Sequence, residues 1–184
     1  MPEVSLNVLD IVQNSVKANA SLIEITILKN TQTKTLSVSI KDNGCGMTDE
    51  QVSRVIDPFY TTRTTRKVGL GVPFFKLSAE LTGGSFSIES KVNVGTEVCA
   101  VYCYEHIDMM PLGDMAATMV SLVSVNPSID FCYTYAVDDR SFALDTREVR
   151  TILEGVPLNE PPVLSFISDF IKENEAELLK ENEE

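Results

Sequence analysis

The sequence predicts an α+β fold, a two-layer sandwich in which helices cover one face of a sheet, followed by a C-terminal α/β extension. Three observations predict it. Paired segments of alternating apolar residues joined by short polar links are typical of hairpins and of antiparallel pairing. Segments with apolar residues at helical spacing lie between these pairs. The sequence pattern changes past residue 105, so we expect the chain to consist of two parts, 1–105 and 106–184.

The first part begins with an expected helix over 5–20, because Leu9, Val12 and Val16 recur on one helical face. Residues 21–41 predict a hairpin, since Ile23, Ile25 and Ile27 alternate on its first strand and three further apolar residues alternate on its second. The remaining elements, in order, are a short helix that a Thr48–Gln51 capping box starts, a loop over 57–69, a helix over 71–82 and a hairpin over 85–104.

The second part repeats a similar order of elements. Asp114 is placed to cap a helix over 114–125, strands follow over 129–136 and 140–144, and a helix ends at Gly155. A final helix then starts among prolines and becomes acidic toward its end. The whole chain reads α-β-β-α-α-β-β followed by α-β-β-α-α.

Composition limits the classes of function. The 184 residues are 43% hydrophobic and carry a net charge of -12, so the chain is globular and neither nucleic acid nor an anionic membrane surface is an expected partner. No apolar run is long enough to span a membrane, and no secretory signal opens the chain. The four cysteines form no close pair, so we expect reduced thiols and a cytoplasmic protein without structural zinc.

Three polar residues share one face of the first helix. Asp10, Asn14 and Lys17 follow an i, i+4, i+7 spacing, which places a carboxylate, an amide and an amine in line. Such a set suits a site where an amide oxygen meets a hard cation and a carboxylate positions a water. A solvated helix face is the alternative for the same pattern.

The segment DNGCGM, residues 42–47, follows a predicted strand. Asp42 stands beside Gly44 and Gly46, which permit positive φ and close approach of a ligand to the backbone. A carboxylate held there would accept a hydrogen bond from an exocyclic amine such as that of adenine. A simple Asn-Gly turn is the alternative.

The segment TTRTTRKVGLGV, residues 61–72, combines cations with glycines that lead into a helix. Arg63, Arg66 and Lys67 precede Gly69 and Gly71, and free amide hydrogens at a helix N-terminus bind phosphate. The pattern lacks the GK[ST] of a P-loop. A flexible basic loop is the alternative.

Taken together and in this order, the motifs resemble those of the GHKL ATP-binding superfamily, which includes the ATP-binding domains of histidine kinases, gyrase, MutL-type ATPases and anti-sigma serine kinases. The resemblance covers roughly residues 5–104 and implies the Bergerat fold, with a mixed, mainly antiparallel sheet and helices on one face. It is carried by LDIVQNSVKANA as the N box, DNGCGM and GLGV as the two glycine boxes, DPFYTTR as the F box, and GGSFSIESKVNVGTEV as the closing hairpin.

The resemblance implies ATP and Mg²⁺ as cofactors, with a role for each matching residue. Asn14 would bind Mg²⁺ and Asp42 would accept the adenine amino hydrogen. Thr96 would support the adenine through a water. The other implied contacts are the base pocket at Gly44, Gly46 and Met47, and the phosphates at Lys17, Thr62, Arg63, Lys67, Gly69, Leu70 and Gly71.

Two departures from the family pattern bear on activity. Asp10 stands where ATPase members carry Glu, and its shorter side chain makes it a weak general-base candidate. His106 is the single histidine and follows the last strand of the second hairpin, so a phosphoacceptor histidine would lie on another chain.

Two functions remain open. One is an Mg-dependent protein kinase or slow ATPase that works with a partner protein or phosphoacceptor in signalling. The other is a non-catalytic, ATP-dependent switch or binding module resembling an anti-sigma regulator. A homodimer is compatible with either.

Overall fold

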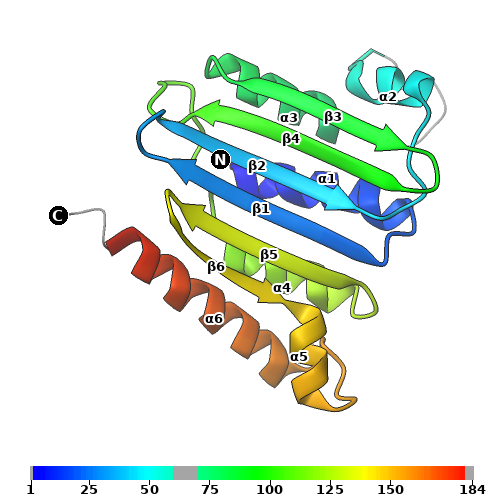
Figure 1. Ribbon diagram of the computed structural model, residues 1–184, viewed down its shortest axis with the longest axis vertical. Coiled ribbons are helices and arrows are strands. Elements are labelled where there is room, and N and C mark those ends of the chain that lie inside the picture. The colour runs from blue at the N-terminus through cyan, green and yellow to red at the C-terminus, as the bar shows by residue number, and fades with distance from the viewer. Residues whose placement is uncertain (1, 60–69, 181–184) are drawn as a thin grey trace.

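The computed structural model describes residues 2–59 and 70–180 and has one six-stranded sheet at its centre (Figure 1). Neighbouring strands are antiparallel except for β1 and β5, which run parallel, so the predicted mixed, mainly antiparallel sheet is confirmed. In spatial order the strands are β3 (Ser85–Lys91), β4 (Gly95–Cys103), β2 (Thr35–Asp42), β1 (Leu22–Asn30), β5 (Asp130–Val137) and β6 (Arg140–Asp145).

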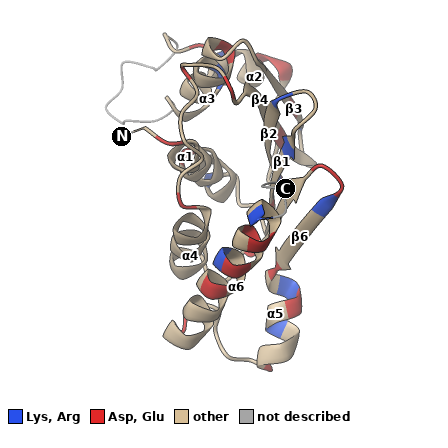
Figure 2. Cartoon of the chain, turned by 90° about the vertical axis from the view of Figure 1, so that its left-hand side faces the viewer, with Lys and Arg blue, Asp and Glu red and all other residues tan. Residues whose placement is uncertain are grey.

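The helices are α1 (Val4–Lys17), α2 (Asp49–Ile56), α3 (Gly71–Leu81), α4 (Met115–Val125), α5 (Thr146–Leu153) and α6 (Pro161–Lys180). Their order along the chain agrees with the prediction. Figure 2 shows α1, α3 and α4 on the same side of the sheet, as the two-layer fold requires. Within the described ranges, no helix has both the length and the apolar character needed to cross a membrane.

The first helix is shorter than the sequence predicts. It ends at Lys17, and Asn19 then adopts a φ of 57°, a left-handed conformation that asparagine tolerates better than most residues. This turn sends the chain back into β1. The capping box at Thr48 is present as predicted: its side chain accepts from Gln51 N, while the Gln51 side chain accepts from Thr48 N.

The core lies between the sheet and the helical layer. Alternate residues of β1, Ile23, Ile25 and Ile27, are fully buried against the helices, as are Phe131 and Tyr133 of β5. The hydrophobic alternation predicted for residues 23–27 therefore correctly identified the face of β1 that the helices cover.

The chain after residue 105 continues the same sheet. Strand β5 pairs with β1 along its whole length, from Leu22 opposite Asp130 to Lys29 opposite Val137. The linker before α4 also hydrogen-bonds to the start of α1, where Ser5 N donates to Leu112 O over 2.8 Å. The predicted parts 1–105 and 106–184 thus both contribute strands to one continuous sheet.

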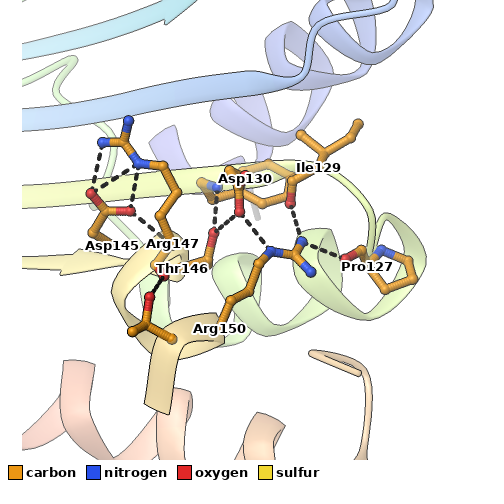
Figure 3. Close-up of polar contacts among 9 residues, drawn as sticks. Pro127, Ile129, Asp130, Asp145, Thr146, Arg147 and Arg150 are labelled. Atoms are coloured by element: carbon orange, nitrogen blue, oxygen red, sulfur yellow. Dashed lines mark hydrogen bonds and ion pairs between the residues drawn. The ribbon is translucent and has the colours of Figure 1, made fainter. Parts of the chain in front are cut away.

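A polar network joins α5 to the start of β5 (Figure 3). Arg150 Nε donates to Asp130 Oδ1 over 2.7 Å, and Thr146 Oγ1 donates to the same oxygen over 3.0 Å. The Arg150 guanidinium also donates to Pro127 O and Ile129 O. Asp130 and Arg150 each have several partners, so the network fixes the position of α5 against the sheet.

A half-buried acid connects α6 to the core. The hydroxyl of buried Tyr133 donates to Glu175 Oε1 over 2.8 Å. Burial raises the pKa of Glu175 above its ordinary value, the charge of Asp114 raises it further, and the Tyr133 hydrogen bond opposes the shift. The folded protein therefore binds this proton more tightly than the unfolded chain.

The Glu175 pKa shift predicts a pH-dependent stability difference. Because the folded-state pKa is raised, Glu175 costs stability as pH rises through and above its unfolded pKa. Glu175→Gln keeps an acceptor for Tyr133 and removes the charge, so its unfolding free energy should exceed the wild-type value at pH 7. The gain should shrink toward pH 4.5.

Urea denaturation at several pH values measures this difference. Glu173→Gln, an exposed change on the same helix, is the matched control and should show no such trend. A difference between Glu175→Gln and wild type that does not vary with pH would contradict the prediction.

Candidate functional site

A cavity of about 110 Å³ opens where β2 ends and β4 begins, beside α1. Five of the residues predicted from sequence line it: Asn14, Asp42, Gly46, Met47 and Thr96. The rest of its lining is mainly apolar, which suits a flat aromatic ligand edged by a few polar groups. The other lining residues are Ile11, Ser15, Ala18, Ile40, Cys45, Val55, Val72, Ile88 and Val98.

Asp42 is held on both of its carboxylate oxygens. It is the last residue of β2, and in the sheet it lies opposite Thr96 of β4. Ser15 Oγ donates to Asp42 Oδ2 over 2.6 Å, and Gly44 N donates to Oδ1 over 2.8 Å. The carboxylate therefore faces the cavity in a fixed orientation as a hydrogen-bond acceptor.

The glycine-rich loop after Asp42 packs closely on the β3–β4 turn. Gly46 has a φ of 67°, and a Cβ there would lie 1.9 Å from Lys91 O, so a side chain is excluded at this position. Asn93 N donates to Cys45 O over 2.7 Å, which ties the loop to the turn. The loop therefore forms a packed wall of the cavity and is more than a simple Asn-Gly turn.

Ser90 connects this wall to β4. Its Oγ accepts from Met47 N over 2.8 Å and lies 2.7 Å from Thr96 Oγ1. Neither Ser90 nor Ser15 was predicted from the sequence to be part of the site. The predicted hairpin turn was a usable signal for Ser90, because pairing about that turn places Ser90 opposite Thr96.

The polar face predicted for the first helix is divided in the structure. Asn14 is half-buried and lines the cavity, whereas Asp10 and Lys17 are exposed and outside its lining. Asp10 lies instead against the start of α3, where a Cβ on Gly71 would be 3.1 Å from Asp10 Cβ. Asp10 is therefore near the N-terminus of α3, away from the Asp42 end of the cavity.

The predicted phosphate segment is only partly described. Leu70 is the N-cap residue of α3, Gly71 is its first residue, and no side chain caps this helix start. Its first amide hydrogens are therefore suited to an anion. The structure places Leu70 in an apolar groove beside Ile56 and Phe74, outside the Asp42 cavity. Thr62, Arg63, Lys67 and Gly69 lie outside the described residues.

The described residues form no cluster of three or more His, Cys, Asp or Glu side chains that could hold a metal. The fit to a metal therefore depends on Asn14, whose amide oxygen is a hard ligand at the cavity. Mg²⁺ is commonly held by few protein ligands together with substrate phosphates and water, so this donor set is compatible with a nucleotide-bound ion.

Comparison with known proteins identifies the family and the fold of the chain. Residues 4–105 match the family model of the histidine kinase-, DNA gyrase B- and HSP90-like ATPases. The sensor histidine kinase YvrG of Bacillus subtilis is 29% identical over 93 residues, which cover 48% of this chain and 16% of YvrG. Sporulation kinase B of the same organism is 32% identical over 94 residues, covering 50% of this chain and 21% of the kinase. The chain thus spans less than a quarter of the length of these relatives.

A solved structure supports the fold. The MutL ATPase domain of Aquifex aeolicus, complexed with ADP, superposes with a TM-score of 0.54 at 16% identity, covering 84% of this chain and 70% of that domain. The Bergerat sandwich implied by the motifs is confirmed by this likeness. Since the family model covers more than half of the sequence, the chain belongs to the histidine kinase-, DNA gyrase B- and HSP90-like ATPases.

Proposed function

We propose that this domain binds Mg-ATP in the Asp42 cavity and, with a partner protein, either transfers the γ-phosphoryl group or hydrolyses ATP slowly. The observation that carries the proposal is the doubly hydrogen-bonded carboxylate of Asp42, which faces an apolar cavity at 2.6 and 2.8 Å from its two donors. A fixed acceptor among apolar walls suits the amino edge of adenine. The family membership supports the same ligand.

The phosphates would extend from the cavity toward the start of α3. The uncapped amides near Gly71 would bind them, and Asn14 would hold a Mg²⁺ that neutralises their charge. Gly44 would support the base pocket through Asp42, and Thr96, which faces Asp42 across the sheet, would hold a water at the adenine. The basic residues Arg63 and Lys67, together with Thr62, Gly69, Leu70 and Lys17, complete the proposed phosphate contacts.

Asp10 is the proposed general base, and a weak one. Its packing against Gly71 supports a position near the phosphates, but its carboxylate is one methylene shorter than the Glu of the ATPase pattern. A shorter reach to the attacking group lowers the expected rate. This substitution favours a second candidate function, an ATP-dependent switch that binds nucleotide without turnover.

A protein partner is supported by an apolar row on α3. Leu70, Phe74, Leu77 and Leu81 are each about half exposed, at 48%, 53%, 49% and 55%. Their spacing places them on one side of the helix, directly after the segment of the proposed phosphate contacts. An exposed row of this kind marks an interaction surface, and here it would couple the nucleotide to a partner or to a second copy.

Phosphate release in excess Mg-ATP distinguishes the two functions. A kinase or ATPase should release phosphate, or transfer it to a partner, and Asp10→Asn should abolish this turnover while ATP binding persists. If the chain is instead a switch, it should bind ATP without releasing or transferring phosphate, both alone and with partners. Absence of ATP binding would contradict both.

The proposed adenine contact predicts the effect of Asp42→Asn. The amide presents a donor where the nucleotide amino group also donates, so ATP affinity should fall roughly 10- to 100-fold, as expected for loss of a hydrogen bond to a charged group. Calorimetry measures the affinity, and Asp49→Asn on exposed α2 is the control. Unchanged affinity in Asp42→Asn would show that the adenine binds elsewhere.

The proposed metal contact predicts the effect of Asn14→Ala. ATP binding by wild type should strengthen with Mg²⁺, and this dependence should disappear when the amide oxygen is removed. A Mg²⁺ titration at fixed ATP measures it, with the exposed neighbour change Gln13→Ala as the control. A dependence that persists in Asn14→Ala would assign the metal to another ligand.

A further inference from the structure

Ser15 is a buried polar residue within α1 whose hydroxyl serves a different element. Its side chain is 3% exposed, and it donates to Asp42 Oδ2 over 2.6 Å. Serines within helices commonly bond to the carbonyl one turn earlier or to solvent. The Ser15 hydroxyl instead crosses from the helical layer to the end of β2, where the cavity opens.

The two donors to Asp42 come from different parts of the chain, one after Asp42 in the sequence and one before it. Gly44 N follows Asp42 in the loop, whereas Ser15 lies on α1. Rotation of an aspartate carboxylate about χ2 is only weakly restricted, so one donor would leave its plane undefined and two fix it. An ionised carboxylate offers about four acceptor positions, which leaves some of them for a ligand.

A carboxylate fixed in this way discriminates between purines. A 6-amino group donates to it, whereas a 6-oxo group would bring a second acceptor oxygen against it, an unpaired polar contact that costs affinity. The degree of discrimination depends on how firmly the plane of the carboxylate is held.

We propose that Ser15 is a positioning residue that sets selectivity for 6-aminopurine nucleotides by holding Asp42 as an oriented acceptor. The proposal rests on the proposed function, in which Asp42 accepts from adenine. Ser15 acts through Asp42 and makes its contribution without needing to touch the nucleotide.

The test compares two nucleotides that differ only at the purine 6-position. Wild type and Ser15→Ala are titrated by calorimetry with ATP and with purine riboside triphosphate, which lacks the amino group. Ser15→Ala should lose roughly tenfold in affinity for ATP, because Gly44 N alone would then hold the Asp42 carboxylate and its plane would no longer be fixed toward the amino group, and should change by less than about twofold for the analogue. The preference for ATP should therefore fall roughly tenfold.

Two further variants separate positioning from general damage to α1. Ser5→Ala removes another buried serine of the same helix, whose hydroxyl donates to Glu3 outside the cavity, and it should leave the preference unchanged. Ser15→Cys retains a weak donor and should give an intermediate preference, which also keeps the test informative if Ser15→Ala fails to fold.

Equal losses for both nucleotides in Ser15→Ala, or an unchanged affinity for ATP, would overturn the role of Ser15. Failure of the proposed function has a separate signature, because it is seen in wild type: the unmodified chain would show no preference for ATP over the analogue.

Discussion

The arrangement of the site depends on one pair of hydrogen bonds, those from Ser15 and Gly44 to the carboxylate of Asp42. They join the helical layer, the end of a central strand and the glycine-rich loop at a single side chain. A charged acceptor at the mouth of an apolar cavity is costly unless donors satisfy it, so these contacts both permit its burial and fix its direction. The position of α1 on the sheet is thereby part of the binding site.

The sheet provides the rigidity that this carboxylate requires. Asp42 ends β2, which is flanked by β4 and β1, and β1 is in turn paired with β5 from the second part of the chain. The residues after 105 therefore stabilise the strand next to the site without lining the cavity. The network around Asp130 and Arg150 holds α5 to this added region, at the same end of the sheet as Asp42: Asp130 lies opposite Leu22 of β1, and the next residue, Ile23, lies opposite Asp42.

Much of the fold was predictable because its signals are local. Hydrophobic alternation located the strands, and the caps at Thr48 and Asp114 located helix starts, since each depends on neighbours within a few residues. The parallel pairing of β5 with β1 was not assigned from the residues, because no local pattern states which strand a distant segment joins. The end of α1 was also missed, since the left-handed conformation of Asn19 shortens it.

For the site, the sequence by itself determined the chemical groups: a carboxylate after a strand, glycines around it, and an amide on the first helix. Only the tertiary structure decided which of them meet. It brought Asn14 and Thr96 to Asp42, placed Asp10 against Gly71 and Lys17 outside the cavity lining, and added Ser15 and Ser90. The reason is physical: a motif fixes residue type and spacing along the chain, whereas the direction of a side chain is set by the packing of helix on sheet and by the register between strands.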